Sequence, residues 1–171
     1  IKKIFDGQKK FDILMSQFAV HYLFSDNTSI KNLITNIKNN LKKDGYLIFT
    51  LLDGELVHEK LSEGKYTSVY TNDEGKRVTL FEIVKKYTGD LQNTTGQAVD
   101  IHMSWISNEG KYIEEYLVPK EFMIKTMKLA GCRLVETDLF KNLYNLNKDY
   151  FMNVINFEEN PKNKQFFEKV K

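Results

Sequence analysis

The stretch 11-FDILMSQFAVHYLF-24 begins as a β-strand and ends in polar and aromatic side chains. Its first part, residues 11–16, is a short, mostly apolar run of the kind that forms a buried strand. The side chains that follow it include Gln17, Phe18, His21 and Tyr22. An amide, an imidazole and two rings directly after a core strand suggest a role beyond packing.

The residues after this stretch predict a parallel sheet. Apolar residues recur at helical spacing over 27–41, and they are Ile30, Leu33, Ile34, Ile37 and Leu41. Asp26, Asn27 or Thr28 can cap this helix, and Lys42, Lys43 and Gly45 are expected to close it. The run 46-YLIFTLL-52 is typical of a strand covered on both faces. Strand, helix and strand form a βαβ unit, and ligands of such sheets bind beyond the carboxyl ends of the strands.

The middle and the end of the chain predict a different arrangement. A short helix over 55–62 is followed by three segments rich in β-branched and aromatic residues, 67–71, 77–86 and 99–106, which predict an antiparallel insertion. A strand over 111–120 is expected to return the chain to the core, followed by a helix from Pro119 to Ala130 that Gly131 ends. Residues 132–140 are predicted to form another strand, and 141–157 helix or irregular structure.

Composition limits the class of protein. The chain has 171 residues, 42% hydrophobic and 13% aromatic, as expected for one soluble globular domain, and no apolar run approaches the roughly 20 residues of a membrane span. A net charge of +2 says little about partners. A single cysteine, Cys132, cannot form an internal disulfide, which favours a reducing compartment. The first residues do not have the pattern of a signal peptide.

No motif for metal or nucleophilic catalysis is present in the sequence. His21, His58 and His102 are scattered, and with one cysteine nothing has the spacing of zinc ligands. There is no Gly-x-Ser-x-Gly elbow and no glycine-rich phosphate loop before a helix. The sequence therefore predicts no metal site.

Gln17, Phe18, His21 and Tyr22 are the first candidate site, because they follow a predicted parallel strand. Each also has an ordinary structural explanation. Phe18 could belong to the core, His21 to a surface turn and Tyr22 to the face of a helix.

Glu115 is the second candidate. In a strand over 111–118 its side chain shares a face with Ile113 and Leu117, whereas Glu114 lies on the other face. A carboxylate among aliphatic neighbours is costly to desolvate unless it has a partner, such as a ligand with paired N–H donors. The alternative is an edge strand on which both glutamates are solvated.

Together these residues resemble the mRNA cap guanine-N7 methyltransferases. The family's aspartate strand and Gln-Phe-x-x-His-Tyr signature are similar to residues 11–22, and its Gly-Gly-x-hydrophobic-Ile-x-Thr strand resembles 44-DGYLIFTLLDGELV-57. A Glu-aromatic-Leu/Ile-Val/Ile run corresponds to 115-EYLV-118, in the family's order. The segments 50-TLLDG-54 and 163-NKQFFEKVK-171 look closer to capping enzymes of large DNA viruses than to cellular enzymes.

The resemblance implies a fold, a reaction and a site. The fold is α/β, the later part of a class I, Rossmann-like S-adenosylmethionine-dependent methyltransferase domain with an antiparallel β insertion. The reaction is methyl transfer from S-adenosylmethionine to N7 of the 5′ cap guanine. Gln17 and Tyr22 would face the cofactor, and Phe18, His21, Tyr22 and Glu115 would hold the guanine. No general base is implied, because N7 already has a lone pair.

The resemblance also implies domain limits and partners. Residues 1–171 would be a partial methyltransferase domain, with the βαβ part at 1–62, the insertion that forms part of the cap pocket at 63–118, and a return to the core at 119–171. The expected partners are the capped 5′ end of mRNA, other capping-enzyme domains or a stimulatory subunit, and no membrane. A viral protein would act in the cytoplasm, in a viral factory or virion, and a cellular one in the nucleus.

Two departures from the family pattern leave alternatives open. The family's Asp-x-Gly-x-Gly loop, which holds S-adenosylmethionine, is not in these residues, and Leu52 stands where cellular members have a proline. The chain is therefore expected to be a fragment with little activity by itself. The alternatives are a non-catalytic stimulatory subunit of a capping enzyme, or a methyltransferase for another small substrate.

Overall fold

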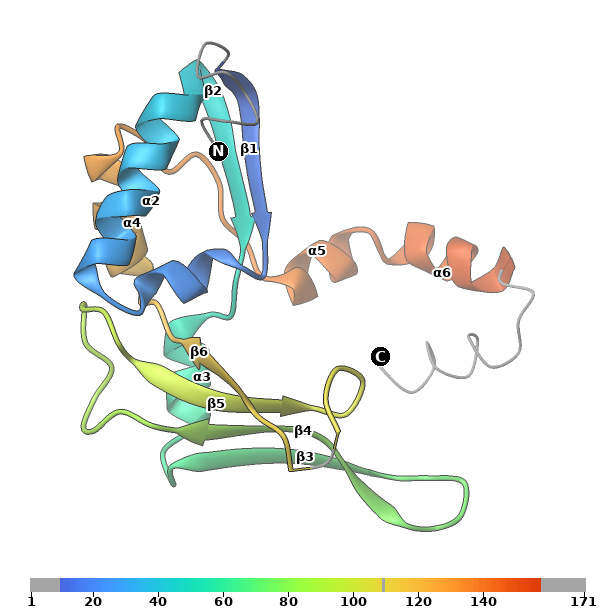
Figure 1. Ribbon diagram of the computed structural model, residues 1–171. Helices are drawn as coiled ribbons and strands as arrows, with labels where there is room; N and C mark the ends of the chain where they lie inside the picture. Colours follow the sequence, from blue (N-terminus) through green and yellow to red (C-terminus); the bar gives the residue numbers. More distant parts are fainter. Residues whose placement is uncertain (1–9, 109, 158–171) are drawn as a thin grey trace. The chain divides into compact units, whose positions relative to one another are not determined.

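The computed structural model describes residues 10–108 and 110–157 (Figure 1). The chain divides into two compact units, Ile1–Arg133 and Leu134–Lys171. The described residues of the first unit form two sheets, one of two strands and one of four. The segment 163-NKQFFEKVK-171 lies outside the described residues.

The predicted βαβ unit is present at the start of the first unit (Figure 1). It consists of β1 (Phe11–Gln17), the 3-10 helix η1 (Val20–Phe24), α2 (Asn27–Asn40) and β2 (Leu41–Thr50). β1 and β2 pair in parallel, with Gln17 opposite Thr50 at their carboxyl ends. Asp26 caps α2 by accepting hydrogen bonds from the backbone N–H groups of Thr28 and Ser29. Hydrogen bonds from the backbone and hydroxyl of Ser29 and from Ser25 lower the pKa of Asp26 to about 2.

One face of this sheet packs on helices. The core there combines residues from η1, α2 and α4 (Lys120–Leu129), and its buried members include Val20, Phe24, Ile30, Ile37, Met123 and Met127. Leu47 and Phe49 of β2 pack against it. Gly131 follows α4 with φ +85°, the left-handed conformation expected of a residue that ends a helix.

The prediction for the second strand was partly wrong. The strand begins at Leu41, so Lys42, Lys43 and Gly45 lie in β2 and do not close the helix. It is also not covered on both faces by described residues, since Tyr46 is 59% exposed and Ile48 42% exposed. The apolar character of the segment could not show whether both faces of the strand are buried. In the structure, one face has no cover within the described chain.

The predicted antiparallel insertion is a four-stranded sheet in the order β3-β4-β5-β6. Its strands are β3 (Lys65–Thr71), β4 (Arg77–Lys85), β5 (Ala98–Met103) and β6 (Ile113–Tyr116). Val99 lies opposite Glu115 in the β5–β6 pair. The strand over 111–120 was expected to return the chain to the core, but β6 is an edge strand of the insertion. The chain reaches the helical core at the end of β6, where Tyr116 packs against that core, and Val118 is one of its buried members.

A short helix joins the two sheets. α3 (Gly54–Lys60) begins where the main chain of Gly54 passes closest to Val118. A Cβ on Gly54 would lie 2.7 Å from the carbonyl oxygen of Val118 and 2.9 Å from its carbonyl carbon. The glycine of 50-TLLDG-54 therefore lets the segment after β2 pack directly on the segment after β6.

The second unit contains α5 (Phe140–Leu146) and α6 (Lys148–Phe157). Residues 141–157 were predicted to form helix or irregular structure, and the two helices fill this segment except for Asn147. Only Phe140, the first residue of α5, precedes it. The strand predicted over 132–140 is wrong, because residues 132–139 form neither helix nor strand. Leu134 is 50% exposed and Val135 65% exposed, so the apolar character that suggested a strand is not matched by a pairing partner among the described residues.

Gly54→Ala tests the close approach between α3 and the end of β6. The added methyl group meets main-chain atoms, which cannot rotate away, so we expect the free energy of unfolding to fall by about 1–3 kcal/mol. Urea unfolding followed by circular dichroism measures it. Glu59→Ala, an exposed change in the same helix, is the control. Equal stability of Gly54→Ala and the wild type would show that the approach relaxes at little cost.

The ionisation of the Glu82 carboxyl is expected to make the free energy of unfolding depend on pH. Burial tends to raise the pKa of this carboxyl, but hydrogen bonds from Lys65, Tyr112 and Thr67 outweigh it and hold the pKa below its usual value. A lowered folded-state pKa stabilises the fold above the unfolded value, and that contribution is lost as pH falls through the folded pKa.

We therefore expect Glu82→Gln to be less stable than the wild type at neutral pH. The difference should shrink as pH falls below about 4.3, the ordinary pKa of glutamate. Urea midpoints along the acid limb measure this, with exposed Glu63→Gln as the control. A difference that stays constant across the acid limb contradicts the role given to the carboxylate charge.

Candidate functional site

The end of β1 is held by Thr50, the residue opposite it at the end of β2. The backbone N–H of Phe18 donates to the carbonyl oxygen of Thr50 at 3.0 Å and to its hydroxyl at 3.1 Å. The same hydroxyl donates to Oε1 of Gln17 at 2.8 Å. Gln17 is exposed, as expected for a side chain that meets a ligand beyond the carboxyl end of a strand.

Phe18 adopts an unusual backbone conformation. Its φ of +47° is left-handed, which costs a residue with a Cβ roughly 1–2 kcal/mol. Its side chain is 52% exposed, so the core explanation for Phe18 is wrong. The hydrogen bonds from its N–H to Thr50 hold the turn that leaves the ring accessible.

His21 and Tyr22 lie on η1, the helix that immediately follows this turn. His21 is only 3% exposed, so it is not a surface turn residue, whereas Tyr22 is 38% exposed. The two rings are 4.3 Å apart between centroids. Val20 and Phe24 of the same helix are members of the hydrophobic core.

Glu115 is the point at which the two predicted groups of residues meet. It is 8% exposed, so it is not solvated although it lies on an edge strand. Glu114, on the other face, is exposed and accepts a hydrogen bond from the hydroxyl of Tyr116. The hydroxyl of Tyr22 donates to Oε1 of Glu115 at 3.1 Å, and Nε2 of His21 lies 3.1 Å from Oε2. The structure thus brings three of the five predicted site residues into direct contact.

The imidazole of His21 is poorly satisfied. Its Nε2 is close to Glu115 but out of line for a hydrogen bond, and neither buried ring nitrogen has a hydrogen-bond partner among the described residues. Buried polar atoms without a partner cost stability and are uncommon in native structures. A side chain retained at such a cost is a candidate for function.

The phenol of Tyr22 acts as a neutral donor. Burial raises the pKa of Tyr22 above its usual value, and the negative charge and hydrogen bonding of Glu115 raise it further. The hydroxyl therefore keeps its proton through the neutral range, and its hydrogen bond holds the carboxylate in place.

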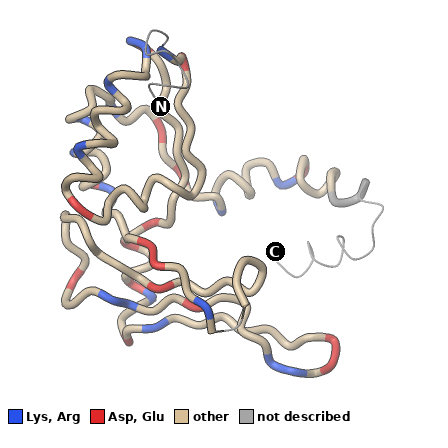
Figure 2. Tube along the Cα trace, in the orientation of Figure 1, with Lys and Arg blue, Asp and Glu red and all other residues tan. Residues whose placement is uncertain are grey.

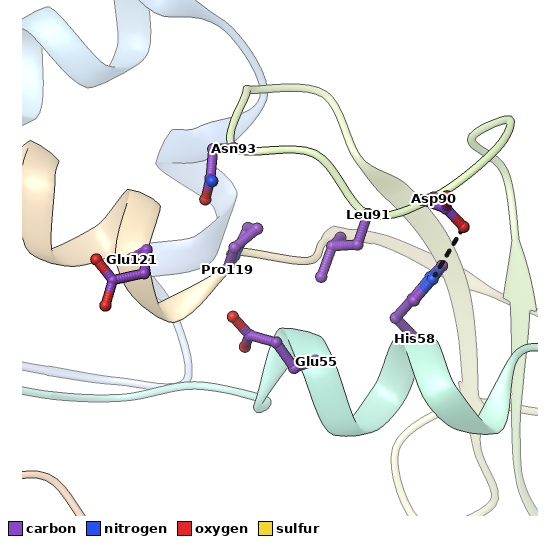
Figure 3. Close-up of a pocket in the computed structure, with 7 residues that line it drawn as sticks. All are labelled: Glu55, His58, Asp90, Leu91, Asn93, Pro119 and Glu121. Carbon is purple, nitrogen blue, oxygen red and sulfur yellow. Dashed lines mark ion pairs between the residues drawn. The ribbon is translucent and has the colours of Figure 1, made fainter.

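A separate pocket of about 340 Å³ lies elsewhere in the first unit (Figure 3). None of the predicted site residues lines it, and its lining residues are Glu55, His58, Asp90, Leu91, Asn93, Pro119 and Glu121. Glu55 already accepts the backbone N–H of Lys120, and Nε2 of His58 lies 3.9 Å from Asp90. Its three carboxylates would repel a phosphate, so it is not the place for a nucleotide.

Three further features of the described residues bear on function. No group of three or more His, Cys, Asp or Glu residues among them is arranged to hold a metal ion. No helix in the described part of the chain is long and apolar enough to cross a membrane. Lysine and arginine residues are spread over several helices and strands of the described chain, with acidic residues interspersed (Figure 2).

Comparison with known proteins identifies the family of this chain. The model of the "mRNA (guanine-N(7))-methyltransferase domain" family matches residues 1–165. The chain belongs to this family. The membership confirms the resemblance drawn from the sequence, and the parallel βαβ unit and antiparallel sheet agree with the α/β fold class expected of such a methyltransferase domain.

Viral capping enzymes are among the relatives. The "Probable mRNA-capping enzyme" of Acanthamoeba polyphaga mimivirus is 44% identical over 149 residues, which are 86% of this chain and 13% of that protein. The "mRNA-capping enzyme" of African swine fever virus (isolate Tick/South Africa/Pretoriuskop Pr4/1996) is 30% identical over 131 residues, 75% of this chain and 15% of its own length. This chain thus spans a small part of the relatives it matches.

More distant proteins match as well. The "mRNA cap guanine-N(7) methyltransferase" of Saccharomyces cerevisiae is 24% identical over 135 residues, 78% of this chain and 30% of that protein. A solved S-adenosylmethionine-dependent methyltransferase from Clostridium acetobutylicum ATCC 824 also matches, with 18% sequence identity and a TM-score of 0.39. The match covers 76% of this chain and 55% of that chain.

Thr50 is the site residue that the sequence analysis missed. It was considered as part of the second strand and of the segment 50-TLLDG-54, but not as a site residue, although it ends that strand as Gln17 ends the first. The signal that could have found it is position, because the carboxyl ends of neighbouring parallel strands meet at one edge. Its hydrogen bonds depend on the register of β1 and β2, which spacing along the chain does not give.

A pair of histidine substitutions tests whether His21 is kept for function. His102 is equally buried, but it has partners in Ser107 and the carbonyl oxygen of Lys111. We expect His102→Leu to lower the free energy of unfolding by about 0.5–1.5 kcal/mol, because it removes the hydrogen bonds of a buried ring. His21→Leu should cost clearly less, because neither ring nitrogen of His21 has a hydrogen bond to lose among the described residues.

Urea unfolding of the two variants beside the wild type makes the comparison. An equal or larger loss in His21→Leu would show that its contact with Glu115 stabilises the fold, and would remove the argument that His21 is retained for function at the expense of stability.

Proposed function

We propose that this chain carries the guanine-binding part of an mRNA cap guanine-N7 methyltransferase, which transfers a methyl group from S-adenosylmethionine to N7 of the cap guanine. The observation that carries the proposal is the buried carboxylate of Glu115, held beside His21 and Tyr22 at the end of a parallel βαβ unit. The viral relatives support a place in a capping enzyme of a large DNA virus, which would act in the cytoplasm or the virion.

Glu115 is suited to read guanine. The N1–H and N2 amino groups of guanine are two adjacent donors, and a carboxylate accepts both, whereas adenine presents an acceptor at N1. An ionised carboxylate has about four acceptor sites, of which the Tyr22 hydroxyl takes one. Burial strengthens such hydrogen bonds, because the competing water is excluded.

Aromatic side chains provide the faces for the base. Phe18 and Tyr22 are both partly exposed and precede or lie on the helix that holds His21. Stacking of a base on an aromatic ring contributes about 1–3 kcal/mol. The left-handed turn at Phe18 keeps its ring out of the core, which fits a role in stacking.

The chemistry requires positioning more than proton transfer. Guanine N7 attacks with a lone pair, so no described residue has to act as a general base. Holding the base in line with the methyl group can lower the barrier by about 7–11 kcal/mol. The residues of this chain supply that orientation by fixing the Watson–Crick edge on Glu115.

The residues present fit one side of S-adenosylmethionine, which supplies the methyl group when bound. Gln17 is exposed at the carboxyl end of β1, where ligands of parallel sheets bind, and Tyr22 follows within one turn of η1. Gln17 and Tyr22 are therefore the residues of this chain that would meet the cofactor.

Glu115→Gln in the full-length gene product tests the guanine-reading role. The amide would turn donors toward the donors of guanine, so we expect kcat/KM for methyl transfer to GpppA-capped RNA to fall about 10- to 100-fold. Glu114→Gln, an exposed change on the opposite face of the same strand, is the matched control and should retain wild-type activity.

Two outcomes would contradict the proposal. Unchanged transfer in Glu115→Gln would remove the role of this carboxylate. A wild-type gene product that binds capped RNA but transfers no methyl group would favour the non-catalytic subunit instead.

A further inference from the structure

We propose that Thr50 is a positioning residue that sets the orientation of the Gln17 amide, so that Gln17 offers N–H donors to an acceptor atom of the methyl donor. This inference rests on the proposed function and assigns a role to a residue outside the guanine-binding set. The carrying observation is that one hydroxyl, that of Thr50, contacts both Gln17 and the backbone of Phe18.

In the structure the oxygen end of the Gln17 amide faces the hydroxyl of Thr50. A threonine hydroxyl has a single hydrogen to donate, and that of Thr50 goes to Oε1 of Gln17 at 2.8 Å. Nε2 of Gln17 has no hydrogen-bond partner among the described residues. Its two hydrogens are therefore the part of the side chain left for a ligand, which must present an oxygen or nitrogen acceptor.

The same hydroxyl also supports the turn that separates the two substrates. The N–H of Phe18 divides its hydrogen bond between the carbonyl oxygen and the hydroxyl of Thr50, at 3.0 and 3.1 Å. Phe18 has φ +47°, which turns the chain out of β1 immediately after Gln17. Thr50 thereby couples the amide before the turn to the ring proposed for the guanine after it.

Thr50→Val removes the hydroxyl and keeps the shape of the side chain. The amide of Gln17 is then free to rotate, and we expect the Kd for S-adenosylhomocysteine, measured by calorimetry on the full-length gene product, to rise about 10-fold. Thr50→Ser keeps the hydroxyl and should restore most of the affinity. Thr35→Val is the matched control, because its hydroxyl donates only to a carbonyl oxygen within helix α2.

A second variant tests the orientation itself. Gln17→Glu keeps an acceptor for Thr50 but replaces the outward N–H donors by an oxygen, so it should weaken binding of S-adenosylhomocysteine at least as much as Thr50→Val. Unfolding midpoints of all variants separate a loss of binding from a loss of fold. In steady state, Thr50→Val should raise the KM for S-adenosylmethionine more than that for capped RNA.

The outcomes separate this inference from the proposed function. Wild-type affinity in Thr50→Val or in Gln17→Glu overturns the inference, even where methyl transfer to capped RNA proceeds. If the wild type binds S-adenosylhomocysteine and the variants weaken it as expected, but no methyl reaches the cap, the inference holds and the proposed function fails. A wild type that binds no S-adenosylhomocysteine overturns both.

Discussion

The buried carboxylate of Glu115 is the constraint on which the arrangement of the site depends. It lies on an edge strand, 8% exposed, and a carboxylate so placed is costly to desolvate without donors. Its donor is Tyr22, 93 residues earlier in the chain, so η1 of the βαβ unit has to reach the antiparallel sheet. Two close approaches make this possible, that of Gly54 to Val118 and the hydrogen bond from the N–H of Gly96 to Phe24.

Buried polar groups on the two faces of the antiparallel sheet differ in how completely they are hydrogen-bonded. On one face, Glu82 receives hydrogen bonds from Thr67 and Tyr112 and an ion pair from Lys65. Across from Glu115 on the other face, both nitrogens of His21 lack hydrogen-bond partners among the described residues. Natural sequences break local rules mainly at functional sites. An imidazole that contacts Glu115 but makes no hydrogen bond to the described residues therefore supports the proposal that the Glu115 face meets a ligand.

The sequence was sufficient where local pattern decides structure. Helix α2, its cap, the left-handed Gly131 and the antiparallel strands were predicted, since each follows from periodicity or turn chemistry over a few residues. The placement of Glu115 and Glu114 on opposite faces followed from strand alternation, whereas the burial of Glu115 on an edge strand did not. The strand over 132–140 failed because its apolar residues have no partner strand in the described chain. The hydroxyl of Thr50 was missed because its contacts depend on the register between two strands 33 residues apart.

The prior contact of Tyr22 with Glu115 bears on how the proposed function would select guanine. A carboxylate that rotates freely in water must lose that freedom on binding, whereas one already held by a neutral phenol has lost it on folding. The phenol uses one acceptor site of Oε1, so the remaining sites stay available for the paired donors of guanine. The raised pKa of Tyr22 keeps the phenol protonated, and so the carboxylate stays oriented throughout the neutral pH range. Under the proposed function, Tyr22 would therefore contribute to guanine selection through Glu115, in addition to any contact that its own ring makes with the base.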